Sequence, residues 1–204
     1  MTALTELDKE IALCQKCEIA KFRTKSVPGE GAEDADIVFI GEAPGWHEDQ
    51  QGRPFIGAAG KFLDELLASI NLDRRTVYIT NVIKSRPTSN RDPLPEEISN
   101  CRPWLDRQIE IINPKMIVTL GRFSMSMFFP GSSISKIHGT AQQRDGVIYF
   151  AMYHPAAALH QNALRQTIGA DMLKIPALLA EIDKLTPTET EPEAQQLNLF
   201  GNNG

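Results

Sequence analysis

Two of the chain's three cysteines, Cys14 and Cys17, lie close together in LCQKC, and the third, Cys101, follows far downstream in SNCRPW. A Cys-x-x-Cys pair in a chain without a recognisable export signal is more typical of a metal or redox site than of a disulfide framework. An odd number of cysteines also leaves one thiol over in any set of disulfides. We therefore expect a metal or redox role in a reducing compartment, the cytoplasm.

A second set of reactive residue types lies in the loop GEAPG, which begins at Gly41. Gly41, Pro44 and Gly45 are expected to form a tight turn that exposes its backbone, before the acidic cluster of Glu42, Glu48 and Asp49. The loop is neither a Walker loop, because no Gly-Lys-Ser/Thr follows, nor a Gly-x-Gly-x-x-Gly dinucleotide turn. Nucleotide hydrolysis and NAD chemistry are therefore disfavoured.

Three further residues have complementary binding chemistry: the ring of Phe55, the amide of Asn81 and the imidazole of His154. Each has an ordinary structural explanation, since Asn often forms turns and His154 precedes a proline that restrains its backbone. In combination, a ring that stacks and two groups that hydrogen-bond are what a pocket for a flipped-out base requires.

The segments that position these residues alternate between two patterns. Continuous apolar segments predict buried strands, and apolar faces at helical spacing predict covering helices. The expected strands are residues 36–41, 77–82, 115–121 and 147–154, and the clearest helices are residues 58–71 and 96–113. This alternation predicts an α/β fold, a three-layer α/β/α sandwich with a mainly parallel four-stranded central sheet. Ligands of such folds bind outside the carboxyl ends of the strands, where Gly41, Asn81 and His154 occur.

Composition predicts one domain, residues 1–185, and a tail, residues 186–204, rich in Pro, Thr, Glu and Gln that we expect to be disordered. No segment approaches the roughly 18 apolar residues that span a bilayer, so no membrane association is expected. The net charge of -5 is partly due to acids of the tail. Residues 84–91 gather three cations without an acid, so a local basic face for nucleic acid remains compatible with the charge.

Several segments together resemble the family 4, or iron-sulfur, uracil-DNA glycosylases. In order they are CQKC, VPGEG, VFIGEAPGWHEDQQGRPFIGAAG, VYITNVIKSRP, NRDPLPEEISNCRPWL, IVTLG and MYHPAAAL, from Cys14 to Leu159. The resemblance implies a monofunctional DNA-repair hydrolase that flips deoxyuridine out of single- or double-stranded DNA and hydrolyses its N-glycosidic bond. The products are uracil and an abasic site, and a monomer is expected.

The resemblance also implies roles for individual residues. Phe55 would stack on uracil, Asn81 would read its polar edge, and the loop with Gly41, Ala43 and Gly45 would line the pocket. His154 would stabilise the negative charge that develops on the uracil O2.

The residue that orients the attacking water is less clearly implied. The best-known relatives have Asp where this loop has Ala43. Glu42 is favoured, Glu48 is the alternative, and a largely dissociative cleavage is also open. Leu159, or else Leu164, would wedge into the space left by the base, unless a helix buries both leucines.

A [4Fe-4S] cluster held by four cysteines is a further implication of the resemblance. Cys14, Cys17 and Cys101 match three of its ligand positions, but Ser85 stands at the fourth. Serine is a poor ligand because its alkoxide forms much less readily than a thiolate. Three interpretations remain open: a cluster with an oxygen ligand or with three cysteines, a Cys3His zinc site completed by His138 or His160, or three thiols without metal.

Two more features complete the functional hypothesis. Some cluster-bearing relatives trap the sugar covalently with a His, but the matching interval TSNRDPLPEEISN has none, so hydrolytic turnover is expected. The tail segment QLNLF resembles the peptide by which bacterial repair proteins dock on the DNA sliding clamp, through Gln196, Leu197, Leu199 and Phe200. Alternative functions are a broader glycosylase for deaminated bases such as hypoxanthine, and a non-catalytic DNA-binding or redox-sensing module.

Overall fold

The computed structural model describes residues 2–159 and 161–185. Its centre is a six-stranded sheet with the strand order β1-β3-β2-β4-β6-β5. The strands are β1 (Glu30–Gly31), β2 (Ile37–Gly41), β3 (Tyr78–Asn81), β4 (Met116–Leu120), β5 (Ala141–Arg144) and β6 (Val147–Met152). The four predicted strands are β2, β3, β4 and β6, and they pair in parallel.

The prediction of a four-stranded sheet is wrong, because an antiparallel strand is added at each edge. β1 pairs with β3 and β5 pairs with β6, so the whole sheet is mixed. β1 has only two residues, and all four residues of β5, Ala-Gln-Gln-Arg, are exposed. Neither segment has the alternating or continuous apolar pattern by which a strand is recognised in a sequence.

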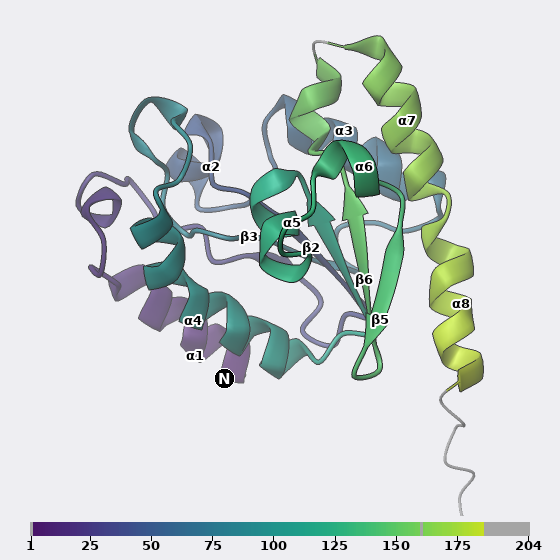
Figure 1. Ribbon diagram of the computed structural model, residues 1–204. Helices are drawn as coiled ribbons and strands as arrows, with labels where there is room; N and C mark the ends of the chain where they lie inside the picture. The colour runs from purple at the N-terminus through teal and green to yellow at the C-terminus, as the bar shows by residue number, and fades with distance from the viewer. Residues whose placement is uncertain (1, 160, 186–204) are drawn as a thin grey trace, which may run out of the picture.

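Helices cover both faces of the sheet, as predicted for the α/β/α arrangement (Figure 1). α1 and α4 lie side by side on one face together with α5, and α3, α7 and α8 cover the other. The helices are α1 (Ala3–Leu13), α2 (Trp46–Gln51), α3 (Ala58–Ser69), α4 (Pro95–Ile112), α5 (Arg122–Phe128), α6 (Ile134–Ile137), α7 (Asn162–Met172) and α8 (Ile175–Leu185). Short 3₁₀ turns are η1 (Glu18–Lys21), η2 (Thr88–Asn90) and η3 (Pro155–Leu159).

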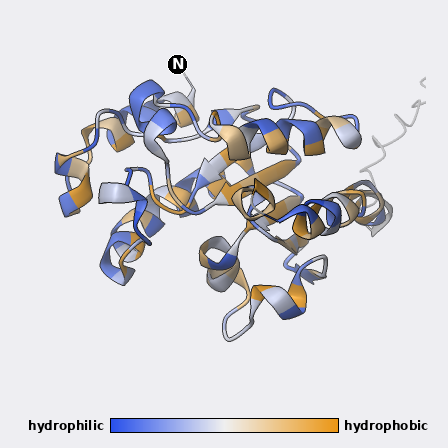
Figure 2. Cartoon of the chain, turned by 90° about the horizontal axis from the view of Figure 1, so that it is seen from above, coloured by the Kyte–Doolittle hydropathy of each residue, from blue (hydrophilic) through white to orange (hydrophobic). Residues whose placement is uncertain are grey.

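The core consists of two apolar layers, one on each side of the sheet. Along β2, Phe39 packs in the layer beneath α3 and α7, whereas Val38 and Ile40 pack in the layer beneath α1 and α4. Successive side chains of a strand point to opposite faces, so a strand that is covered on both sides is apolar throughout. Figure 2 shows these apolar strands at the centre of the molecule.

This arrangement brings the carboxyl ends of the parallel strands to one edge of the sheet. Gly41 ends β2, Asn81 ends β3, and β6 ends two residues before His154. Within residues 2–159 and 161–185, no helix is both long enough and apolar enough to cross a membrane. The predicted tail, residues 186–204, lies outside the described residues.

Candidate active site

A cavity of about 230 Å³ lies at the carboxyl ends of β2, β3 and β6. It is smaller than the roughly 300–1,000 Å³ typical of pockets for drug-sized ligands, and so suits a single small ring. Predicted site residues that line it are Glu42, Ala43, Gly45, Glu48, Phe55, Asn81 and His154. The structure therefore brings the predicted stacking ring, amide, imidazole and acids into one site.

Asn81 ends β3 and lines the cavity with a buried side chain. The residue is 2% exposed, and its Oδ1 is buried without a hydrogen-bond partner among residues 2–159 and 161–185. A buried acceptor without a partner is costly, which is typical of a group that awaits a ligand. A Cβ at Gly41 would lie 2.4 Å from this oxygen and 2.5 Å from the Phe55 ring, so only glycine lets the three residues meet.

His154 is held as a neutral imidazole with a defined tautomer. Burial lowers its pKa to about 4, although Glu48 acts in the opposite direction. The backbone N–H of Ala156 donates to Nδ1 over 3.1 Å, so Nδ1 is the acceptor and the proton resides on Nε2. The ring also stacks on Phe55, with 5.5 Å between centroids and 24° between planes. His154 therefore offers a neutral N–H donor in the cavity.

Phe55 has a strained backbone that a distant arginine holds in place. Its φ of 51° lies in the left-handed region, which is unfavourable for a bulky residue. Arg74 donates to the carbonyl oxygens of Phe55 over 2.8 Å and of Pro54 over 2.5 Å. A Cβ at Gly60 would lie 1.7 Å from the Phe55 oxygen, so α3 can pass only with glycine there.

Sequence reasoning missed both supporting residues of Phe55. Gly60 offered one signal, since a glycine inside a helical pattern often marks a close backbone approach. Arg74 offered none, because it follows Phe55 by 19 residues and binds backbone atoms.

The two candidate acids have different environments. Glu48 accepts hydrogen bonds at Oε1 from the backbone N–H groups of Ile56, over 3.1 Å, and Gly57, over 3.0 Å. These donors lie at the amino end of α3, where a carboxylate satisfies otherwise unpaired N–H groups. Glu48 thus fixes the segment that follows Phe55.

Glu42 accepts no comparable hydrogen bonds from the described backbone. It follows β2 directly and is half-buried, and its carboxylate has no hydrogen-bond partner among the described residues. Burial raises its pKa, Asp92 adds to that effect, and Arg122 opposes it. A carboxylate with a raised pKa that faces a cavity is a candidate general base.

The predicted basic stretch contributes fewer surface cations than expected. Arg91 lines the cavity, and its guanidinium makes two hydrogen bonds to Glu97 over 2.6 and 2.8 Å. Arg86 is partly exposed and donates to Asn90. Lys84, in contrast, is only 1% exposed, so the expectation of three surface cations is wrong and two remain.

The two candidate wedge residues are not equivalent. Leu159, at the end of the η3 turn that follows His154, is 42% exposed. Leu164, in α7, is half-buried. The interpretation that one helix buries both leucines is therefore wrong, and Leu159 is the more available side chain.

The three cysteines come together at one end of the layer beneath α1 and α4. Cys14 caps α1, Cys17 precedes η1, and both pack against the apolar cluster that contains Cys101 of α4. Ser85, at the predicted fourth position, is 2% exposed, and its hydroxyl accepts a hydrogen bond from Arg23 over 2.9 Å. The same guanidinium donates to the carbonyl oxygen of Cys14 over 2.9 Å.

This donor set does not fit a cluster with Ser85 as its fourth ligand. The hydroxyl is already engaged by the Arg23 guanidinium, and a serine alkoxide forms much less readily than the thiolate that a cluster binds. Across the described ranges, no group of three or more His, Cys, Asp or Glu side chains is arranged to hold a metal ion.

The zinc alternative with His138 fails for a different reason. Its Nδ1 is 2.7 Å from Oδ2 of Asp171 in α7 and its ring packs on Tyr153, in the layer beneath α3 and α7, whereas the three cysteines pack in the layer beneath α1 and α4 on the other face of the sheet. His160, the other candidate, lies outside the described residues.

Comparison with known proteins gives consistent matches. The family description "Uracil DNA glycosylase superfamily" matches residues 28–180. The type-4 uracil-DNA glycosylase of Sulfurisphaera tokodaii is 48% identical over 188 residues, which cover 87% of this chain and 86% of the relative. The enzymes of the same name from Archaeoglobus fulgidus and Saccharolobus solfataricus are 47% and 44% identical, covering 87% and 88% of this chain and 94% and 88% of those proteins.

Proposed function

This chain belongs to the uracil-DNA glycosylase superfamily, in its type-4 group, and from this membership we infer how its cavity excises uracil. The protein is a base-excision-repair glycosylase that releases uracil from DNA. The assignments of residues to steps that follow are proposals, which rest on the geometry of the cavity.

The base is held by Phe55 and Asn81. The ring of Phe55 stacks on the extruded uracil, and the free Oδ1 of Asn81 accepts the uracil N3–H while its amide N–H donates to O4. Cytosine presents the opposite pattern, an acceptor at N3 and a donor at N4, and would leave the buried amide mispaired. Such mismatches discriminate strongly because buried polar groups lose their partners.

Charge on the leaving group is stabilised by His154. As the bond between C1′ and N1 breaks, its electron pair passes to the uracil ring and negative charge builds on O2. A neutral imidazole with its proton on Nε2 donates a hydrogen bond to that oxygen. Donors fixed in a water-poor site lower the energy of a developing anion most, because they need no reorganisation.

The attacking water is oriented by Glu42. Its carboxylate has no hydrogen-bond partner in the described part of the chain, so it can accept the proton of a water whose oxygen forms the new bond to C1′. Glu48 acts instead as a support, because one of its oxygens already binds the amino end of α3.

DNA is engaged around the mouth of the cavity. Leu159 fills the space that the extruded nucleotide leaves, which offsets an unstacking cost of a few kcal/mol. Because a flipped nucleotide can come from a duplex or from a single strand, both are proposed substrates of a monomeric enzyme. The sliding clamp remains a proposed partner, through the segment from Gln196 to Phe200, which lies outside the described residues.

No step of this scheme runs through a cluster. The resemblance implies a [4Fe-4S] group, but three thiols and a serine hydroxyl that is bound to Arg23 do not supply its four ligands.

The proposal rests on two groups that lie in one cavity. The Oδ1 of Asn81 is buried and has no hydrogen-bond partner among the described residues, and His154 is neutral with its proton on Nε2. The test is an oligonucleotide with one deoxyuridine, incubated with protein and then cleaved by alkali at abasic sites. We expect wild type to produce cleavage, and Asn81→Ala and His154→Ala to be slowed by roughly 100-fold with unchanged circular dichroism. Wild-type rates in both variants would refute the assignment of these roles.

A further inference from the structure

Lys84 is an unusual residue in the core of this protein. It follows Asn81 by three positions and is only 1% exposed. Its Nζ lies 2.7 Å from each of three acceptors: the backbone oxygen of Asn81, Oγ1 of Thr80 and Oε1 of Gln108. Three acceptors can use all three protons of an ammonium group, so the contacts match the charged form of the side chain. Burial acts against that form and lowers the pKa of Lys84 to about 7.

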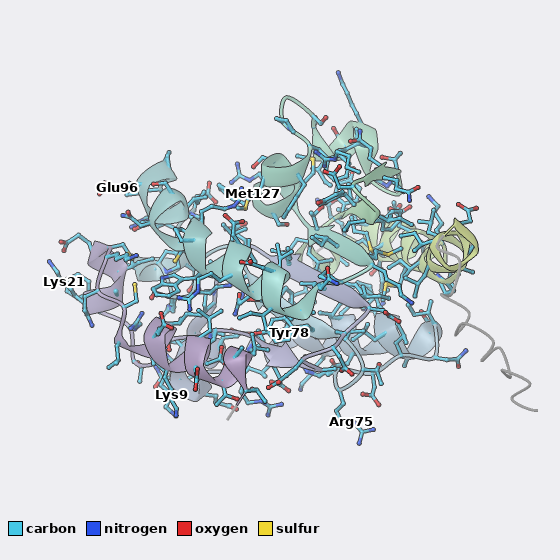
Figure 3. The ribbon with its side chains drawn as sticks, turned by 90° about the horizontal axis from the view of Figure 1, so that it is seen from below. Lys9, Lys21, Arg75, Tyr78, Glu96 and Met127 are labelled. Atoms are coloured by element: carbon cyan, nitrogen blue, oxygen red, sulfur yellow. The ribbon has the colours of Figure 1, made fainter. Side chains whose placement is uncertain are left out.

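The acceptors of Lys84 are themselves held by a wider network. Gln108, in α4, donates to the hydroxyl of Tyr78 over 3.1 Å and to the carbonyl oxygen of Pro28 over 2.9 Å. Thr80 donates to the same Pro28 oxygen over 2.6 Å. Figure 3 views the molecule from the side of α1 and α4 and labels Tyr78 there. The network thus ties β3 to α4 and to the segment that precedes β1.

Packing alone does not explain a lysine at this position. Within residues 2–159 and 161–185, none of the ion pairs closer than 4 Å involves Lys84. The carboxylate of Asp8 favours the charged form of Lys84, but from beyond that distance. A buried charge without a carboxylate in direct contact is costly, and an apolar side chain of similar volume would fill the space at lower cost. The Lys84 ammonium binds the backbone oxygen of Asn81, a residue that lines the cavity, and this contact gives a reason for its presence.

We propose that Lys84 is a positioning residue for uracil excision and acts through Asn81. The Asn81 amide oxygen has no hydrogen-bond partner among the residues that the structure describes, so its direction depends on how rigidly the Asn81 backbone is held. The ammonium binds the carbonyl oxygen of that peptide and links it to Thr80 and Gln108. This inference rests on the proposed role of Asn81 in reading the uracil edge.

A double-mutant cycle separates this role from a general effect on folding. Single-turnover excision rates are measured with excess protein for wild type, Lys84→Met, Asn81→Ala and the double variant. We expect Lys84→Met to slow excision by about tenfold in the wild-type background, as a lost hydrogen bond from a charged group predicts. In the Asn81→Ala background we expect a change of less than about twofold, because the two residues act as one unit.

Two further variants keep the test decisive. Gln108→Met removes another Lys84 acceptor but leaves the contact between Lys84 and Asn81. It should therefore lower the thermal unfolding temperature, while slowing excision less than Lys84→Met does. If Lys84→Met does not fold, Lys84→Arg is used in the same cycle, since it keeps the charge but cannot direct three donors from one atom.

Equal slowing in both Asn81 backgrounds, or no slowing by any Lys84 substitution, would overturn the proposal. A wild-type protein without excision activity would instead refute the roles proposed for the cavity, so the two failures are distinguishable.

Discussion

Arg74→Met is the substitution that most directly tests how the stacking ring is positioned. Arg74 is outside the cavity, but its guanidinium binds the carbonyl oxygens of Phe55 and Pro54. Methionine keeps much of the side-chain volume and removes both hydrogen bonds. The strained backbone of Phe55, with φ at 51°, then loses its main polar restraint.

The size of the effect follows from these contacts. A hydrogen bond from a charged donor contributes about 1.5–3 kcal/mol, and left-handed strain at a bulky residue costs about 1–3 kcal/mol. The Arg74 side chain is 16% exposed, so water can replace only part of what is lost. Its ion pairs with Asp64, over 3.1 Å, and with Glu30, over 3.7 Å, involve partly exposed carboxylates and add little. We expect the free energy of unfolding to fall by about 2–4 kcal/mol. A shift of the Phe55 ring by about 1 Å would slow excision by about 100-fold.

The assay combines urea unfolding with single-turnover excision, and the chain offers a matched control. Arg75 is the neighbouring arginine, labelled in Figure 3, with a side chain that is 89% exposed and pairs with Asp73. Arg75→Met should change stability by less than about 1 kcal/mol and leave excision unchanged. If Arg74→Met lost stability but excised uracil at the wild-type rate, the argument that Arg74 positions Phe55 would be refuted. Equal slowing by both arginine variants would refute it as well.

Further predictions concern the acids, the thiol site and the tail. Burial raises the pKa of Glu42, so its carboxylate takes up a proton at higher pH than an ordinary glutamate, and excision should decline as pH falls through that raised value. Glu42→Gln should remove this acid limb from the pH profile of the single-turnover rate, whereas Glu48→Gln should mainly lower the thermal unfolding temperature. The reverse result would assign the attacking water to Glu48 and the supporting role to Glu42. Ser85→Cys, purified without air, should bind more iron and acid-labile sulfide than wild type, and equal contents in the two proteins would contradict our account of Ser85. Deletion of residues 196–200 should abolish capture by the sliding clamp in a pull-down but leave excision on short oligonucleotides intact, and retained capture would exclude that segment as the docking peptide.

The parts of the fold that were predictable are those with a strong apolar pattern. The four central strands are buried on both faces, so their sequences are continuously apolar. Parallel strands bring their carboxyl ends together, which is why Asn81 and His154 could be assigned to one site. The edge strands could not be predicted, because β5 is fully exposed and its pairing with β6 is made by backbone atoms, which carry no sequence pattern.

Lys84 shows a different limit of sequence reasoning. Next to Arg86 and Arg91 it resembles part of a basic surface, and its burial depends on acceptors from β3 and α4 that only the folded chain assembles. Ser85 could be identified as a departure from the family pattern, but its bond to Arg23 joins residues 62 positions apart. In both cases the residue type was informative, whereas its partner was fixed by tertiary structure.

The cavity shows the same limit, because the sequence reveals the residues that line it but not the contacts that orient them. Asn81, His154 and Phe55 belong to motifs that sequence reveals, yet each is oriented by a hydrogen bond to or from a backbone atom. Binding groups that are fixed before the base arrives do not have to be reorganised as charge develops, and this is where a preorganised site gains its rate. Replacing Arg74 or Lys84 should therefore slow excision although neither residue lines the cavity. We therefore expect the family motifs to identify the groups that meet the base, and the supporting contacts of Arg74 and Lys84 to affect how fast the bond breaks.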